Sequence, residues 1–290
     1  ELPGYLNLTQ NYSAATGTAV EYNALSIAST LAWGLGYFGM PHILLRFMAI
    51  EDEKKLKTSR RVASIWVVIS LGVGVFIGVV GNAMSKVGAI EVLEGKSQAE
   101  TIIVRIAHLL STYGILPAIC AGVILAGILA ATMSTADSQL LASASSVSQN
   151  ILQEFFGVRL TEKKSMVVAR TTVIIISVIA ILLASDPNSS VFEIVSFAWA
   201  GFGATFGPVV LISLFWKDAN KYGVMAGMLS GGIMIFVWKY IISQFGGIFK
   251  IYELLPAFIV ALVVIIVVSM ATGGPEQKVV DKFNEVRHSK

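Results

Sequence analysis

Charged residues are scarce in this sequence. Only 13% of the 290 residues are charged and 55% are hydrophobic, whereas ordinary soluble domains carry about 25% charged residues. The single cysteine, Cys120, cannot form an intrachain disulfide, and the three histidines do not cluster. These absences exclude an ordinary soluble domain and argue against a metal centre or a catalytic triad. We therefore expect no enzyme, and nothing suggests nucleic acid as a partner.

Long uncharged runs are present instead. A bilayer core about 30 Å thick needs about 20 consecutive apolar residues per helix. The runs are continuous and rich in Gly and Ala, which favours helices over barrel strands. We therefore predict an all-α polytopic membrane protein in contact with the lipid bilayer. Its seven spans are expected at 22–45, 62–85, 114–150, 166–184, 191–215, 222–243 and 254–272.

Basic residues are distributed unequally between the two sides of these spans. Sixteen of the 21 Lys and Arg residues follow the odd-numbered spans, and five lie on the other side. The positive-inside rule then predicts a cytoplasmic tail at 273–290 and an extracellular segment at 1–21. An odd number of spans with an outside start is unusual for a complete protein, so we expect further chain before Glu1.

The first span contains an irregular stretch, Trp33-Gly-Leu-Gly-Tyr-Phe-Gly-Met-Pro41. Glycine and proline predict an interrupted helix, and irregular backbone at membrane depth is tolerated where it lines a cavity or is buried in protein. Trp33, Tyr37 and Pro41 are spaced by four residues, which favours a shared face suited to a small, partly apolar solute. Aromatic packing or interface anchoring with a simple proline kink is the alternative. The glycines of the stretch are Gly34, Gly36 and Gly39.

The third span is unusually long and becomes polar in its second half. Its roughly 37 residues would measure about 55 Å as one helix. Ala131, Ser134 and Thr135 share one helix face, and a hard cation such as sodium prefers oxygen ligands. The carbonyl of Ala131 and the two hydroxyls therefore predict part of a sodium site. The alternative is that the hydroxyls bond back to carbonyls of their own helix.

The sequence alone does not decide the roles of two further features. Asp137 is the only acid well inside a span, and it either supports the cation site or bonds to neighbouring helices. In the fifth span, the glycine-rich run 197–208 ends at Pro208 and permits either hinging or close helix packing.

Three stretches resemble the solute:sodium symporter family: residues 33–47, 130–146 and 198–211. The likeness extends from about residue 20 to 272, and the first stretch favours the bacterial members that transport proline over those for sugars or vitamins. The resemblance implies two inverted five-helix repeats, as in the leucine-transporter fold. Residues 22–215 would form the second repeat and 216–272 two peripheral helices, while the first repeat, in the missing N-terminal half, would be a partner.

The resemblance also implies roles for individual residues. Trp33, Tyr37 and Pro41 would line the substrate pocket, and Ala131, Ser134 and Thr135 would bind co-transported sodium together with ligands from the missing half. The implied function is sodium-coupled uptake of a small solute, L-proline, by alternating access across the bacterial inner membrane. Another small organic solute, or a membrane solute sensor of the same fold, is the alternative.

Overall fold

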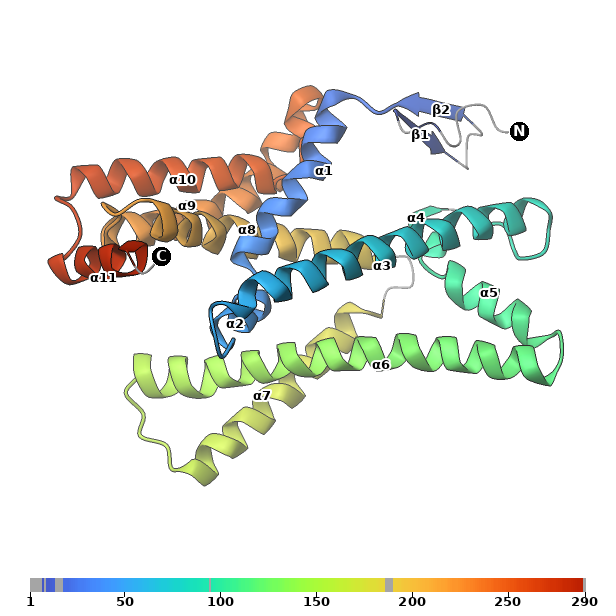
Figure 1. Ribbon diagram of the computed structural model, residues 1–290, viewed down its shortest axis with the longest axis horizontal. Coiled ribbons are helices and arrows are strands. Elements are labelled where there is room, and N and C mark those ends of the chain that lie inside the picture. The colour runs from blue at the N-terminus through green and yellow to red at the C-terminus, as the bar shows by residue number, and fades with distance from the viewer. Residues whose placement is uncertain (1–6, 8, 14–17, 94, 186–189, 289–290) are drawn as a thin grey trace. The chain divides into compact units, whose positions relative to one another are not determined.

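The computed structural model describes residues 7, 9–13, 18–93, 95–185 and 190–288, and the chain divides into two compact units (Figure 1). The first unit joins Glu1–Ala49 to Phe192–Lys290, and the second is Ile50–Val191. Both are built almost entirely of helices, which confirms the predicted helical class. The predicted division of the chain at residue 215, into a five-helix repeat and two peripheral helices, stays a prediction.

The first unit begins with a short hairpin and then becomes helical. Strand β1 pairs with β2 in antiparallel register, with Gln10 opposite Glu21 and Ser13 opposite Thr18. The sequence analysis expected only an extracellular segment here. The elements of this unit are β1 (Gln10–Ser13), β2 (Thr18–Glu21), α1 (Ala24–Gly36), η1 (Tyr37–Gly39), α2 (Pro41–Met48), α8 (Val191–Phe215), α9 (Lys221–Tyr240), η3 (Ile242–Phe245), η4 (Gly247–Lys250), α10 (Leu254–Ala271) and α11 (Gln277–His288).

The second unit is a set of helices dominated by α6. This helix packs against α5 and α7 and continues directly into η2, a π-helix. Together α6 and η2 form one 41-residue apolar helical segment, so the long third span predicted from the sequence is present. The elements of this unit are α3 (Lys55–Lys86), α4 (Gly95–Ala99), α5 (Ile102–Ser111), α6 (Ile115–Ser145), η2 (Ser146–Phe155) and α7 (Glu162–Leu183).

Six helical segments of the described residues are long and apolar enough to cross a membrane. They correspond to the second to seventh predicted spans. The first predicted span, 22–45, does not form one such helix, because it is divided between α1, with 13 residues, and α2, with eight. The chain is therefore a multi-pass membrane protein in which one apolar segment is interrupted.

The core of the first unit is made by α8, α9 and α10. Small residues line the contact between α9 and α10: Gly223 faces Ser269, Gly227 faces Ile265, and a Cβ at Gly231 would lie 3.1 Å from that of Ala261. Glycine at every fourth position lets two helix backbones approach closely, which is how helices associate in lipid. Six buried residues join α8 to this pair: Ala200, Ala204, Ile235, Leu254, Ala257 and Phe258.

The glycine-rich run of α8 serves close packing. Helix α8 continues through Pro208 without a break, and Gly203, Gly207 and Pro208 are buried. A Cβ at Gly203 would lie 2.7 Å from the Cα of Gly36 in α1, so the two backbones are in contact at this point. Of the two interpretations that the sequence left open for this run, the structure favours packing.

Candidate functional site

The interruption of the first apolar segment lies between Gly36 and Pro41. Helix α1 ends at Gly36, η1 follows as a single 3-10 turn, and Met40 is extended with φ −81° and ψ 115°. A residue before proline is driven out of the helical region by the proline ring. Pro41 then begins α2, a first-turn position where its missing N–H costs no hydrogen bond. Glycine and proline thus place the break where the sequence predicted it.

The glycines at the break have different roles. A Cβ at Gly36 would overlap the indole of Trp199, and one at Gly39 would overlap the backbone of Phe202 and Gly203. Both glycines therefore allow the broken segment to lie directly on α8. Gly34 has open space around it, so no packing constraint in the structure accounts for glycine there.

Trp33 lies inside a stack of aromatic rings. Its ring is parallel to those of Phe192, Trp199 and Tyr252, with centroids 5.3, 5.5 and 5.9 Å away. The indole N–H of Trp199 also donates a hydrogen bond of 3.0 Å to the carbonyl oxygen of Trp33. Such contacts orient and immobilise a ring. The structure thus shows aromatic packing of Trp33, while its predicted contact with a solute stays a prediction.

Tyr37 and Pro41, in contrast, are exposed. The side chain of Tyr37 is 52% exposed and meets the edge of Trp199 at 4.8 Å between centroids. Pro41 lies at the start of α2, one turn further along the chain. These two side chains and the open space at Gly34 leave part of the predicted substrate face free to contact a solute.

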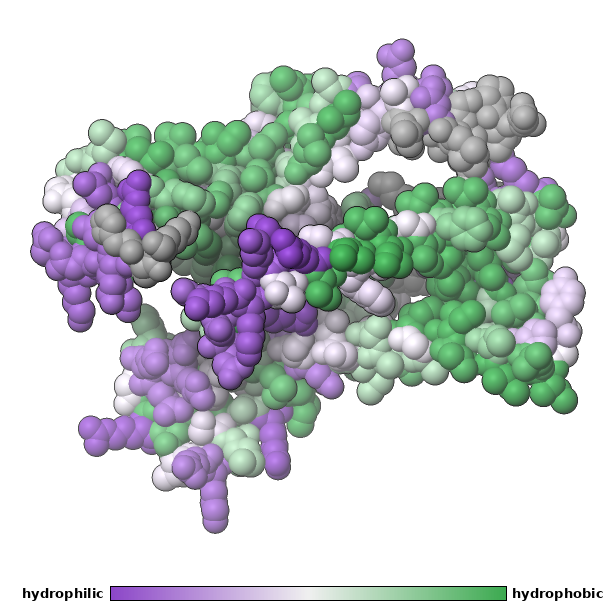
Figure 2. Space-filling view, viewed as in Figure 1, coloured by the Kyte–Doolittle hydropathy of each residue, from purple (hydrophilic) through white to green (hydrophobic). Residues whose placement is uncertain are grey.

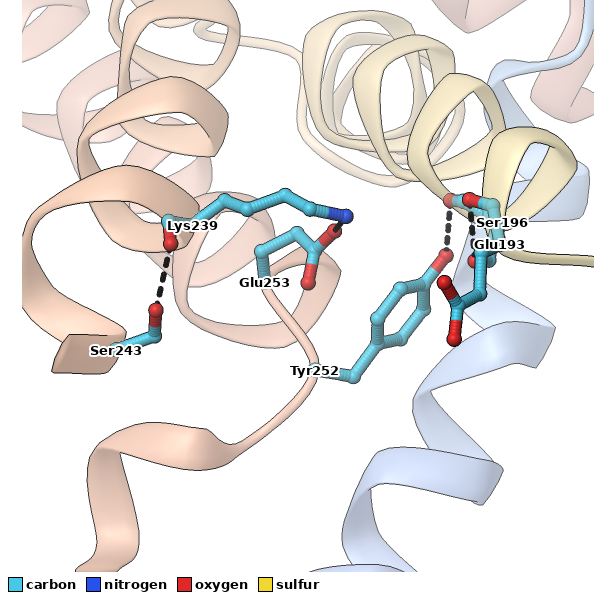
Figure 3. A network of polar contacts seen from close by, with 6 residues as sticks. All are labelled: Glu193, Ser196, Lys239, Ser243, Tyr252 and Glu253. Atoms are coloured by element: carbon cyan, nitrogen blue, oxygen red, sulfur yellow. Dashed lines mark hydrogen bonds and ion pairs between the residues drawn. The ribbon is translucent and has the colours of Figure 1, made fainter. Parts of the chain in front are cut away.

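A polar network holds the aromatic stack to its neighbours (Figure 3). The hydroxyl of Tyr252 donates to the carbonyl oxygen of Ser196 at 2.6 Å, and its backbone N–H donates to the hydroxyl of Ser29 at 3.1 Å. Burial, and the Glu253 carboxylate beside it, raise the pKa of Tyr252 well above its ordinary value. The Tyr252 hydroxyl is therefore a fixed, neutral donor.

Next to this tyrosine, Lys239 and Glu253 form an ion pair of 3.2 Å (Figure 3). The carboxylate is more deeply buried than the ammonium group, with 13% against 36% of the side chain exposed. The sequence analysis missed the roles of Tyr252 and of this pair. The sequence did carry a signal for the ion pair, because Lys239 lies at the end of the sixth predicted span and the oppositely charged Glu253 lies directly before the seventh.

The predicted sodium ligands lie on α6 of the second unit. Ala131, Ser134 and Thr135 are all exposed on this helix. The hydroxyl of Thr135 donates to the carbonyl oxygen of Ala131 at 3.2 Å, which is the back-bonding that the sequence analysis left open. Within α6 the same carbonyl also accepts the backbone N–H of Thr135, so both of its lone pairs are used, while the hydroxyl oxygen of Thr135 keeps its lone pairs for a cation.

These three residues supply only part of a coordination shell. Hard cations of this kind take about six oxygen ligands, and one helix face provides three. Asp137 is exposed on the same helix, and in the described part of the chain its carboxylate makes no ion pair. Among the described residues, no group of three or more His, Cys, Asp or Glu side chains is arranged so that it could hold a metal ion. Further oxygens must come from groups other than those on this face.

The sequence matches one known protein family and is similar to several curated proteins. The sequence profile of the Sodium:solute symporter family matches residues 6–231. A sodium/proline symporter of Haemophilus influenzae is 41% identical over 263 residues, covering 90% of this chain and 51% of its own length. The high-affinity proline transporter PutP of Bacillus subtilis is 38% identical over 274 residues, covering 93% and 53%. The sodium/proline symporter of Escherichia coli is 36% identical over 268 residues, covering 91% and 50%.

The chain spans about half the length of the curated relatives that it matches. No solved structure matches it. Its family profile nevertheless covers the broken segment, the polar face of α6 and the glycine-rich α8 in one continuous match. On this evidence the chain belongs to the Sodium:solute symporter family.

Proposed function

We propose that this chain is part of a sodium-coupled transporter that takes up L-proline across the bacterial cell membrane. The observation that carries the proposal is the similarity to three proline transporters, each aligned over about nine-tenths of this chain. The interrupted apolar segment supplies aromatic and apolar groups for the solute. The hydroxyl-bearing face of α6 supplies oxygen ligands for sodium. The protein is then a transporter and not an enzyme, and sodium is its co-transported ion.

In this proposal the solute lies against the face made by Trp33, Tyr37 and Pro41. Trp33 is held in place by its stack and forms a rigid wall, while the exposed Tyr37 and Pro41 contact the solute. Gly34, Gly36 and Gly39 support the site by permitting the break and the close approach to α8. A rigid apolar wall with a few adjustable contacts suits a small, cyclic, partly apolar amino acid.

Sodium in this proposal is bound by the Ala131 carbonyl and the hydroxyls of Ser134 and Thr135. Asp137 supports this site through its negative charge. The remaining ligands come from the part of the relatives that this sequence does not cover, their N-terminal half. Residues 22–215 then represent one of two inverted repeats, and 216–272 a peripheral pair of helices.

Transport proceeds by alternating access, in which both ligands bind near the midplane of the membrane. Each positive charge that moves inward gains roughly 2.3 kcal/mol per 100 mV of membrane potential. Because coupling between sites is reciprocal, sodium must raise the affinity for proline by the same factor as proline raises that for sodium. The unequal distribution of Lys and Arg supports a cytoplasmic tail at 273–290 and an outside position for residues 1–21.

The sodium ligands can be tested in a full-length transporter that carries this sequence. The double variant Ser134→Ala with Thr135→Ala removes both hydroxyls from the face. We expect the sodium concentration for half-maximal proline uptake to rise at least tenfold. Thr132→Ala is the matched control, since its hydroxyl also bonds back along α6, to the Ile128 carbonyl oxygen at 2.9 Å. An unchanged sodium dependence in the double variant would refute the ligand assignment.

The solute face is tested by Tyr37→Ala. Because this side chain is largely exposed, its removal leaves the aromatic stack around Trp33 in place. We expect proline to bind more weakly while the sodium response, measured at saturating proline, stays nearly unchanged. Tyr113→Ala, at another exposed tyrosine, is the control. Equal effects of the two variants on proline affinity would contradict the proposed face.

A further inference from the structure

A groove of about 1240 Å³ lies at one end of the first unit. It is lined by the end of α8, the start of α9, the turn between them, and α11. The same end carries the last residues of α10, so the groove lies where three membrane-spanning helices terminate. Figure 2 shows hydrophilic residues gathered over α11, next to the hydrophobic surface of α10.

Helix α11 presents an apolar stripe to this groove. Val279, Phe283 and Val286 are spaced by four and three residues and therefore share one face, and all three line the groove. Cations flank the stripe on both sides: Lys278 and Lys282 on one, Arg287 on the other. The acids of the helix, Asp281 and Glu285, do not line the groove. This arrangement is typical of a helix that lies in the plane of a membrane interface.

The groove has an excess of positive charge. Five basic side chains line it and only one acidic side chain does, that of Glu276. Lys221 and Glu276 are 3.9 Å apart, and both are largely exposed. The other four basic side chains make no ion pair with any described residue. They are Lys217, Lys278, Lys282 and Arg287. Concentrated positive charge in a hollow attracts anions, and the attraction weakens with added salt.

The floor of the groove is fixed by Asn220. This residue is 6% exposed, and its side-chain amide donates to the Ser269 carbonyl oxygen at 3.2 Å and to the Thr272 hydroxyl at 2.8 Å. Its side-chain oxygen accepts the N–H of Gly223 at 2.9 Å and so caps α9. The turn before α9 is thereby tied to the end of α10. A binding surface that is already fixed loses less entropy on binding.

We propose that this groove binds the headgroup of an anionic phospholipid. Its phosphate contacts Lys217, Lys278, Lys282 and Arg287, while the acyl chains lie along the ends of the spans. A lipid accounts for the apolar lining as well as the charge: Leu214 and Phe215, at the end of α8, are 61% and 79% exposed. A soluble anion would satisfy the cations and leave these side chains uncovered. The site goes beyond the proposed transport function and does not depend on it.

The proposal is tested by titrating tail-labelled fluorescent phosphatidylglycerol into the full chain in uncharged detergent micelles, with labelled phosphatidylcholine in parallel. The variant Lys278→Gln, Lys282→Gln, Arg287→Gln removes three groove cations. Since each cation near an anionic headgroup contributes to the attraction, we expect about tenfold weaker binding or more. The matched control is Lys54→Gln, Lys57→Gln, Arg60→Gln, which removes the same charge from exposed positions outside the groove. Circular dichroism checks that both variants remain helical.

A selective loss of phosphatidylglycerol binding in the groove variant, with less than about twofold change in the control, supports the proposal. An equal loss in both variants means general attraction to positive charge and overturns it. Equal binding of phosphatidylcholine and phosphatidylglycerol by the unchanged protein also overturns it. Displacement of the lipid by millimolar inorganic phosphate assigns the groove to a soluble anion instead, and overturns the choice of lipid.

Discussion

The contact between α1 and α8 at Gly36 and Gly203 leads to a sharp prediction. In Gly203→Ala, the new Cβ would lie 2.7 Å from the Cα of Gly36 and 2.9 Å from Cδ1 of Leu254. Since neither helix backbone can yield without moving the whole contact, we expect an overpacking cost of about 1–3 kcal/mol. Alanine also has a higher helix propensity than glycine, by about 1 kcal/mol, which offsets part of this cost in the variant alone.

Gly201→Ala isolates the steric effect. Gly201 lies in the same helix, two residues away, and has no atom near the position of a new Cβ. Both variants gain the same helix propensity, so their difference in unfolding free energy is the overpacking cost. We expect Gly203→Ala to unfold about 2–10 °C below Gly201→Ala, as followed by circular dichroism in detergent. Equal midpoints for the two variants would show that the two backbones do not touch at Gly203.

Three further predictions concern side chains that hold the first unit together. Trp199→Phe keeps an aromatic ring but removes the hydrogen bond to the Trp33 carbonyl, and we expect a loss of about 0.5–1.5 kcal/mol in unfolding measurements. Asn220→Ala removes the α9 cap and the amide donors and should lower the unfolding free energy by about 1–3 kcal/mol, whereas Asn220→Asp should destabilise at least as much in thermal unfolding, because its buried carboxylate would face the carbonyl oxygens of Ser269 and Gly274. Because the pKa of Tyr252 is raised in the folded protein, its contribution to stability is complete below the ordinary value of 10.0 and is lost above it. Thermal unfolding at rising pH should therefore show a smaller loss of stability above that pH in Tyr252→Phe than in the unchanged protein.

Much of the fold could be predicted because long apolar runs leave few alternatives in lipid. The second to seventh spans follow from length and charge alone, and the break at Gly36 to Pro41 follows from residue chemistry. The hairpin at Gln10–Ser13 and Thr18–Glu21 was not predicted, since it lies in a polar segment with no long apolar run. Helix α11 was missed because the sequence analysis treated 273–290 only as a charged tail.

The candidate site was predictable as a set of residues but not as an arrangement. The partners of Trp33 come from α8 and from Tyr252, far away in the sequence, and no local pattern indicates which rings will meet. The sequence left both packing and solute contact open for Trp33, and the packing contacts that the structure shows are tertiary ones. For Thr135 the interaction that competes with sodium binding is local. Its hydroxyl bonds to a carbonyl oxygen of its own helix, and the sequence was enough to predict this alternative.

The stack around Trp33 limits how the broken segment can move. Rings of α1, α8 and Tyr252 overlap face to face, and Ser29 is hydrogen-bonded to the same loop. A swing of α1 must either separate these rings or carry α8 and the beginning of α10 along with it. In the second case the three move as one rigid body, and bending falls on the extended residue Met40, which lies between η1 and α2 and whose carbonyl oxygen accepts the N–H groups of Ile43 and Leu44 at the start of α2. One residue would then act as the pivot for the whole assembly.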